Sequence, residues 1–327
     1  MSVNRPMSLA VVGAGDFGHR YVRALFDSPR LALAGVAEQE SSRREMVARE
    51  FSVPVASTLQ ELLDQVPRGA IDAVVIATPP TAHLADLQLV VERGVPALVE
   101  KPVVSAAEGL AFLRSLTDQQ REMIVPAHLS RHLDQVRLMR RMIEGQKLCL
   151  ISAWRYVPRE RVALHGADHP ALSAMIHDFD LVRSVADSRV ASLHVTATRS
   201  EPGLAHPDTV VATLTLDNGA LVTVGNSWTL PNSSRYVEAR FEAVTANNKF
   251  VLTTPSDGLV VREGEGDVFP APELGLFGDG ALGGAFERQL DHFAGIVSGE
   301  IEPEVTVADA EWSIELAIRV ANWPEVT

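Results

Sequence analysis

Cysteine, basic residues and long apolar runs are scarce in this chain. Its single cysteine, Cys149, can form no disulfide within the chain and cannot build a zinc site alone. The chain has 29 Lys and Arg residues and 42 Asp and Glu residues, and its net charge of -13 repels phosphate backbones and anionic membrane surfaces. No apolar run approaches the roughly 18 residues of a membrane span, and Leu9 to Val12 is too short for a signal-peptide core. We therefore expect a cytoplasmic protein with neither a nucleic-acid nor a membrane partner.

What remains is the composition of a folded globular protein. Apolar residues make up 46% of the chain and charged residues 22%, which excludes disordered, collagen-like and coiled-coil chains. The 327 residues suggest two domains, at roughly 150 residues for each.

The first third of the chain alternates short β-branched runs with segments of helical length, a pattern typical of a parallel sheet covered by helices. The expected strands are Leu9 to Val12, Leu31 to Ala37, Ala73 to Ala77, Ala97 to Val99 and Met123 to Val125. The expected helices are Phe17 to Asp27, Ser41 to Glu50, Thr81 to Arg93 and Ala106 to Gln120. We predict an α/β Rossmann domain with a doubly wound parallel sheet over residues 1–126.

After Pro126 the pattern changes to one helix, Leu133 to Ile143, followed by long alternating strands. The expected strands are Leu148 to Val157, Ser192 to Thr198, Thr209 to Leu216, Ala220 to Trp228, Val237 to Ala243 and Leu259 to Val261. A turn at Asp217 to Gly219 predicts a hairpin, and helices Phe286 to Ser298 and Val307 to Ala321 close the chain. Residues 127–327 are therefore predicted as an α+β domain. The Gly-rich stretch Gly275 to Gly284 is either a plain connection or a mobile lid.

A glycine fingerprint indicates dinucleotide binding. The run Gly13 to Gly18 has the spacing G-x-G-x-x-G between a strand and a helix, where a pyrophosphate can approach backbone amides. Glu38 lies twenty residues after Gly18, at the end of the second strand, where a carboxylate accepts hydrogen bonds from ribose hydroxyls and repels a 2′-phosphate. We therefore predict NAD rather than NADP. Arg43 and Arg44 are either solvated helix residues or ligands of a 2′-phosphate.

Three motifs in this order carry a family resemblance: the glycine fingerprint, a Thr-Pro-Pro loop from Thr78, and Glu-Lys-Pro from Glu100. With them, the chain resembles the glucose-fructose oxidoreductase, inositol dehydrogenase and rhizopine-catabolism (Gfo/Idh/MocA) family over nearly its whole length. The resemblance implies a Rossmann domain followed by a domain with an open, mostly antiparallel sheet. It also implies that the cofactor lies against Gly13, Gly15, Asp16, Phe17, Gly18, Glu38, Thr78, Pro79, His83, Glu100 and Lys101.

The resemblance further implies that Lys101 points at substrate and nicotinamide. A lysine after the carboxyl end of a strand lies where α/β sheets bind ligands, and it can donate to the hydroxyl or carbonyl being interconverted. A surface lysine before a proline turn is the alternative for that residue taken alone.

A second group of polar residues lies within the stretch Leu172 to Ser184. Ser173, His177 and Asp180 fall on one helical face, which either faces solvent or, as the resemblance implies, contacts substrate. An imidazole can take the hydroxyl proton during oxidation, so His177 is the expected catalytic base. Many relatives carry an aspartate where this chain has Ser173. Asp168 is a candidate substitute for that acid.

The stretch upstream of His177 also suggests metal ligands. The candidates are His165, Asp168, His169 and His177. Their spacing matches no zinc motif, and hydride transfer from nicotinamide needs no metal, so no metal site is predicted.

Further substrate contacts are expected from residues near the predicted domain junction. His128 and Arg131 resemble a segment bordering the family's pocket, and Arg131 either binds substrate or pairs with an acid. Trp154 is either a sugar-contacting residue or sheet packing. Cys149, among apolar neighbours, is expected to be buried and inert.

The predicted function is NAD(P)-dependent hydride transfer at a secondary alcohol or ketone of a cyclitol, sugar or sugar derivative. An imine reductase of the same fold and a non-catalytic dinucleotide-binding regulator are the alternatives. A homodimer or homotetramer is expected, because an open sheet leaves one face to be covered.

Overall fold

The structure is a computed structural model that describes residues 5–162, 168–201, 203–231, 237–254, 261–263, 266–268 and 284–324. The chain forms two compact units, one of Met1–Ala127 with Gln289–Ala310 and one of His128–Arg288 with Glu311–Thr327. Residues 289–310 thus pack with the first unit, a placement that the predicted boundary after residue 126 did not include. No helix of the described residues is long and apolar enough to cross a membrane.

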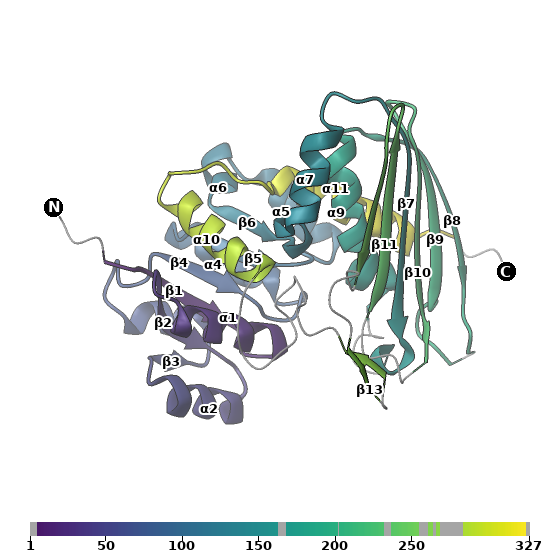
Figure 1. Ribbon diagram of the computed structural model, residues 1–327. Coiled ribbons are helices and arrows are strands. Elements are labelled where there is room, and N and C mark those ends of the chain that lie inside the picture. The colour runs from purple at the N-terminus through teal and green to yellow at the C-terminus, as the bar shows by residue number, and fades with distance from the viewer. Residues whose placement is uncertain are drawn as a thin grey trace. The chain divides into compact units, whose positions relative to one another are not determined.

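The first unit contains a six-stranded sheet in the order β3-β2-β1-β4-β5-β6, with every neighbouring pair parallel (Figure 1). Its strands are β1 (Met7–Val12), β2 (Leu31–Ala37), β3 (Val55–Ala56), β4 (Ala73–Ile76), β5 (Ala97–Glu100) and β6 (Ile124–Ala127). Its helices before β6 are α1 (Asp16–Asp27), α2 (Ser41–Phe51), α3 (Leu59–Gln65), α4 (His83–Arg93), α5 (Ala107–Ser115) and α6 (Asp118–Glu122). This order confirms the predicted doubly wound Rossmann fold.

The central strands are buried on both faces, which explains their continuous apolar runs. Every residue of β4 is fully buried, as expected for a parallel strand covered by helices on both sides. Helix α1 adds one apolar stripe, with Tyr21, Val22 and Leu25 buried at successive turns.

The prediction of one helix from Ala106 to Gln120 is wrong. The segment forms α5 and α6, which are separated by an extended Thr117. The Thr117 side chain accepts a hydrogen bond from the Gln120 backbone, and the Gln120 side chain accepts one from the Thr117 backbone. This capping box starts a new helix, so the Thr-x-x-Gln pattern was the missed signal.

The second unit contains a six-stranded sheet in the order β12-β11-β7-β10-β9-β8. Its strands are β7 (Leu148–Pro158), β8 (Val190–Thr198), β9 (Thr209–Leu216), β10 (Leu221–Leu230), β11 (Glu238–Thr245) and β12 (Lys249–Thr254). Only the β7–β10 pair of this sheet is parallel, so the predicted mostly antiparallel sheet is confirmed. β9 and β10 form the predicted hairpin, with Gly219 at φ +84° in its turn.

Shorter elements complete the described chain. The 3-10 helices are η1 (Leu129–His132) and η2 (Arg159–Arg161), and η3 (Ala171–Met175) is a π-helix. The remaining helices are α7 (Asp134–Ile143), α9 (Ile176–Ala186), α10 (Ala285–Val297) and α11 (Val307–Ala321), and β13 (Val261–Glu263) and β14 (Gly266–Val268) form a small hairpin. His165, Leu259 and residues 275–283 of the Gly-rich stretch lie outside the described residues.

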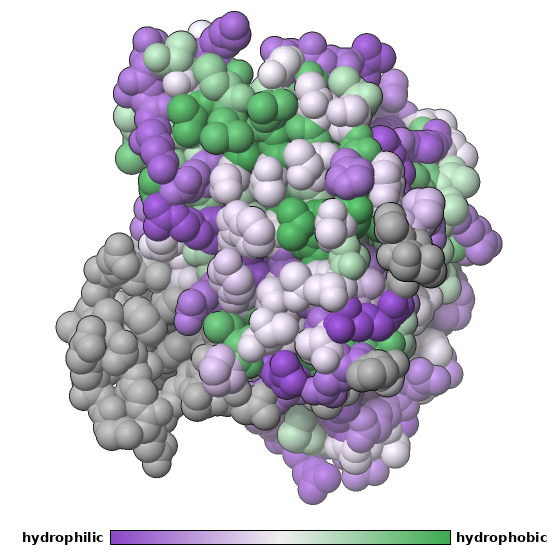
Figure 2. Space-filling model, turned by 90° about the vertical axis from the view of Figure 1, so that its right-hand side faces the viewer, coloured by the Kyte–Doolittle hydropathy of each residue, from purple (hydrophilic) through white to green (hydrophobic). Residues whose placement is uncertain are grey.

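The larger sheet of the second unit has one helix-covered face and one open face. Helix α9 packs against β7 on the covered side, where Ile151 and Ala153 are fully buried. The open face carries Leu150, Leu221 and Val251, each at least 40% exposed, and Figure 2 shows apolar side chains gathered over part of it. Leu150 and Leu221 are register partners on neighbouring strands.

The expectation of a buried Cys149 is wrong. The side chains of Cys149 and Leu150 are both exposed in β7, between the buried Leu148 and Ile151. Pairing with β11 skips Cys149, since Val244 pairs with Leu150 and Thr245 with Leu148. Such a bulge interrupts the alternation of buried and exposed side chains, and apolar neighbours in the sequence do not reveal it.

Candidate active site

The glycine turn of the first unit has the geometry of a dinucleotide-binding loop. Gly13 has φ +86°, and a Cβ there would lie 2.7 Å from the Ala77 carbonyl oxygen. A Cβ at Gly18 would lie 1.8 Å from the Gly13 carbonyl oxygen, so only glycine lets α1 pack this close to the turn. At Gly15 the nearest atom to such a Cβ is Arg43 Nη1, 3.9 Å away. The turn therefore leaves space beside the N-terminus of α1, where a pyrophosphate can approach backbone amides.

Glu38 lies beside this turn, at the end of β2. Its carboxylate accepts hydrogen bonds from the backbone N–H of Ala14 at 2.6 Å and of Glu40 at 2.8 Å, and the residue is 7% exposed. Each carboxylate oxygen has a second lone pair for a ribose hydroxyl. Arg44 donates to the Glu38 carbonyl oxygen, and Arg43 pairs with the Glu40 carboxylate at 3.0 Å. Both arginines thus have partners within the protein.

His83 connects the Thr-Pro-Pro loop with the loop after β5. Its ring is fully buried, with Nε2 2.8 Å from the Thr78 carbonyl oxygen and Nδ1 3.0 Å from that of Pro102. Burial lowers the pKa of His83, so the neutral ring donates one of these hydrogen bonds at a time. The ring thus joins the two loops, and the cofactor contact expected of His83 stays a prediction. The Thr78 hydroxyl donates to Asp86 at 2.9 Å, a partner that the sequence did not suggest.

Lys101 follows the carboxyl end of β5, as the motif predicted. The preceding Glu100 accepts a hydrogen bond from the Lys101 backbone N–H at 3.0 Å and one from the Tyr21 hydroxyl at 2.8 Å. Desolvation raises the pKa of Glu100, and the Lys101 charge and the Tyr21 hydrogen bond oppose that rise.

In the second unit, α9 carries His177 next to the π-helix η3. The Ser173 hydroxyl, inside η3, donates to the His169 carbonyl oxygen at 3.3 Å. His169 Nδ1 accepts from the Ala171 N–H at 3.1 Å, so this nitrogen caps the helix start. The predicted single helix through residues 172–184 is therefore π-helical at its beginning. Such turns are rare and occur frequently at functional sites.

Asp180 is fully buried and bound by Arg131. Arg131 Nη2 lies 2.7 Å from Asp180 Oδ1, and Nε lies 2.9 Å from Oδ2, in a bidentate pair. Arg131 is 2% exposed, and His128 Nδ1 lies 3.8 Å from Asp180 Oδ2. Of the two alternatives for Arg131, the structure has the one in which it pairs with an acid. The same pair occupies the Asp180 carboxylate that we expected to contact substrate.

A second, partly buried pair, which the sequence did not predict, links α9 to the sheet. Arg155 donates to both Asp178 oxygens at 2.9 Å. Asn226, the register partner of Arg155 on β10, is fully buried and donates to the Arg155 carbonyl oxygen at 3.2 Å. Trp154 points to the opposite, open face of the sheet, since neighbouring residues of a strand alternate. The structure therefore does not bring Trp154 together with His177.

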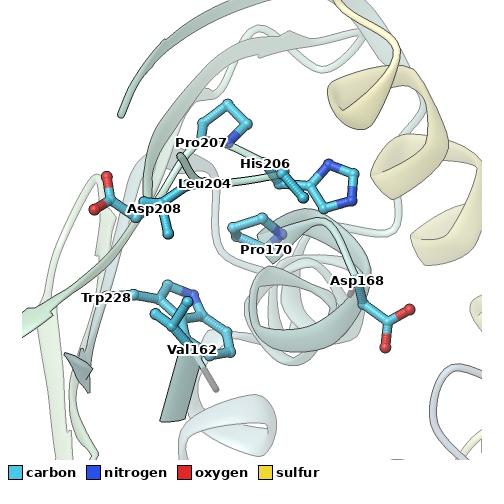
Figure 3. A pocket seen from close by; sticks show the side chains of 9 residues that line it. Val162, Asp168, Pro170, Leu204, His206, Pro207, Asp208 and Trp228 are labelled. Atoms are coloured by element: carbon cyan, nitrogen blue, oxygen red, sulfur yellow. The ribbon is translucent and has the colours of Figure 1, made fainter. Parts of the chain in front are cut away.

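Asp168 lines a small pocket at the start of the π-helix (Figure 3). Pro170, Val162 and Trp228 form its apolar part, and Asp168 and Asp208 lie on opposite sides of it. The Asp168 side chain is exposed, so its carboxylate is available as an acid near η3. Among the described residues, no group of three or more His, Cys, Asp or Glu side chains has an arrangement that could hold a metal ion.

Comparison with known families decides the classification. The model of an oxidoreductase family with an NAD-binding Rossmann fold, GFO_IDH_MocA, matches residues 7–128. The model of the GFO/IDH/MocA C-terminal domain matches residues 152–249. The chain belongs to the Gfo/Idh/MocA family. It is an NAD-dependent oxidoreductase, as predicted.

Individual relatives agree with this family membership. Inositol 2-dehydrogenase 1 of Saccharopolyspora erythraea is 29% identical over 260 residues, which cover 78% of this chain and 76% of that protein. The crystal structure of a myo-inositol dehydrogenase from Corynebacterium glutamicum has a TM-score of 0.78 at 20% identity and covers 96% of this chain and 95% of that one. GenD2 from gentamicin A biosynthesis, solved in complex with NAD, has a TM-score of 0.81 at 17% identity. The match covers 96% of this chain and 92% of that chain. The Gfo/Idh/MocA fold thus extends over nearly the whole chain.

Proposed function

We propose that this protein oxidises or reduces a secondary alcohol or ketone carbon of a cyclitol, sugar or sugar derivative. The proposal rests on the glycine turn with Glu38 beside it, in the same unit as the Glu-Lys-Pro motif. The inositol dehydrogenase relatives support this substrate class. Its expected location is the cytoplasm, in keeping with the single cysteine.

The residues of the turn fit NAD. The space at Gly15 accommodates a pyrophosphate beside α1, and the Glu38 carboxylate has free lone pairs for ribose hydroxyls. When bound, NAD supplies a nicotinamide ring that accepts a hydride from carbon and, as NADH, returns it.

Lys101 and His177 are the proposed catalytic residues. A lysine ammonium donates a hydrogen bond to the substrate oxygen and stabilises negative charge that develops on it. An imidazole takes the hydroxyl proton during oxidation and returns it during reduction. Asp168, His128 and Ser173 are proposed to border the substrate, whereas Arg131 and Asp180 form an ion pair with each other.

The test is formation of NADH from NAD with a panel of cyclitols, hexoses, uronates and amino sugars. The expected result is turnover with at least one cyclitol or sugar. Turnover only in the direction of imine reduction, or tight NAD binding without turnover on any substrate, would contradict the proposal.

Replacing Glu38 with serine should lower the preference for NAD over NADP by about ten-fold. A carboxylate within about 4 Å of a 2′-phosphate repels it by more than 1 kcal/mol at the protein surface, and serine removes this repulsion. The ratio of kcat/KM for the two cofactors measures the change. Glu45→Ser on the exposed side of α2 is the matched control, and an unchanged ratio in Glu38→Ser would contradict the assigned role.

Replacing Ser173 with aspartate should raise kcat about ten-fold and shift the His177-dependent limb of the pH profile to higher pH. A carboxylate one helical turn from a histidine stabilises the imidazolium and raises its basicity. Ser173→Asn is the neutral control of similar size. Equal kcat in the two variants would show that charge at this position does not act on the reaction.

The open sheet face is proposed to pair with a second copy of the chain. Sedimentation at micromolar concentration should show a dimer or tetramer, and Leu221→Asp should shift it to smaller species, because a charge on an apolar contact is costly to bury. Leu138→Asp, at an equally exposed leucine of α7, is the control. A wild-type protein that sediments only as a monomer would contradict the proposal.

A further inference from the structure

Three side chains from distant parts of the chain meet beside Lys101, all within the first unit. Tyr21 lies on α1, Glu100 at the end of β5 and Gln289 on α10. The Tyr21 hydroxyl oxygen is 2.8 Å from Glu100 Oε1 and 2.9 Å from Gln289 Oε1. Tyr21 and Gln289 are almost fully buried, with 0% and 1% exposed.

The hydrogen-bonding capacity of this group gives it a direction. A phenol has one proton to donate, and burial together with Glu100 raises the pKa of Tyr21, so the hydroxyl keeps that proton. The charged acceptor is Glu100, and hydrogen bonds to charged groups are the stronger ones. Gln289 Nε2 is buried and has no hydrogen-bond partner among the described residues. A half-turn of the amide brings this nitrogen to the hydroxyl oxygen as a donor.

The second oxygen of Glu100 continues the series. Glu100 Oε2 accepts the hydrogen bond of the Lys101 backbone N–H at 3.0 Å. Hydrogen bonds therefore connect α10 and α1 to the backbone of the lysine. Helix α1 begins at the glycine turn, so the same helix reaches both the turn and the Glu-Lys-Pro loop.

We propose that Gln289, Tyr21 and Glu100 form a buried hydrogen-bond relay that fixes the Lys101 backbone, which makes Tyr21 and Gln289 positioning residues for the reaction. This inference rests on the proposed catalytic role of Lys101. Neither Tyr21 nor Gln289 belongs to the motifs that identified the site, and Gln289 lies 188 positions after Lys101.

The relay also sets the charge state of Glu100. The titratable groups that act on this carboxyl are Tyr21 from α1 and Lys101 beside it, and both lower a pKa that desolvation raises. Removing the Tyr21 hydroxyl therefore raises the pKa of Glu100 further. The ionised form, which accepts both hydrogen bonds, then persists only at higher pH.

The experiment compares wild type with Tyr21→Phe, which keeps the ring and removes only the hydroxyl. We expect kcat to fall about ten-fold, the Kd for NAD to stay unchanged, and the acid limb of kcat/KM to move to higher pH. Tyr156→Phe, on the exposed face of the other sheet, makes the same chemical change away from the relay and should leave all three quantities unchanged. A pH profile of Tyr21→Phe that superimposes on wild type would overturn the proposal.

Gln289→Leu provides an independent test of the relay. We expect a smaller loss of kcat than in Tyr21→Phe, and no further loss when the two changes are combined, since members of one network are not additive. Additive losses would overturn the relay. Lys101→Met distinguishes a failure of the relay from a failure of the proposed function. Full activity in Lys101→Met would show that Lys101 is not catalytic, whatever the result for Tyr21→Phe.

Discussion

Replacing Lys101 with methionine should reduce kcat about 1000-fold while leaving the Kd for NAD nearly unchanged. A positioned general acid or base contributes about 100-fold to 10,000-fold to a rate, and methionine keeps the length of the side chain without its charge. In the proposed function, NAD binds mainly through the glycine turn and Glu38, which this substitution does not alter. Steady-state turnover and a direct NAD titration separate the two effects.

Lys147→Met is the matched control for this substitution. Lys147 is exposed in the second unit, just before β7, so the same chemical change there should leave kcat and NAD affinity unaltered. If Lys101→Met turned over substrate as fast as wild type, the lysine would not be catalytic. A loss of NAD binding that matched the loss of turnover would point to a structural role instead.

Arg131→Met should destabilise the second unit by about 3–5 kcal/mol. The substitution leaves the Asp180 carboxylate fully buried without its bidentate partner, and an uncompensated buried charge is costly. Urea unfolding followed by a signal from the second unit measures the loss. Its midpoint should fall to lower urea concentration with little change in slope.

A double variant separates the cost of the unpaired charge from the loss of packing. Arg131→Met combined with Asp180→Leu removes both charges and should recover much of the lost stability. Arg189→Met is the exposed control, because the Arg189–Asp217 pair lies on the surface and such pairs contribute about 0–1 kcal/mol. Equal losses in Arg131→Met and Arg189→Met would contradict the importance of the buried pair.

The parts of the fold that the sequence predicted depend on local chemistry. Gly13 and Gly18 are required by a positive φ and by a close backbone approach, and such requirements are visible as a spaced motif. Strands β7 to β11 of the second unit were predicted with ends within two residues of those observed, since alternation marks a half-covered sheet, whereas β12 was not predicted. The split between α5 and α6 was missed because the capping box at Thr117 was not weighed against helical length.

The partners of the site residues could not be predicted in the same way. The family resemblance implied that Asp180 contacts substrate, and the sequence did not show that its carboxylate is bound by Arg131 from another element. Gln289 carried no signal, since its contact with Tyr21 joins residues 268 positions apart. Pairings at such distances follow from tertiary packing and leave no pattern in a single sequence.

The most direct test of the central claim is the transfer of a labelled hydride. The protein is incubated with NAD and with cyclitols and sugars that carry deuterium on their carbinol carbons. The mass of the reduced cofactor is then measured by mass spectrometry. Our account predicts NADH that is one mass unit heavier than the unlabelled cofactor, formed with at least one of these compounds and lost in Lys101→Met. Absence of labelled NADH with every compound, from a protein that binds NAD, would contradict it.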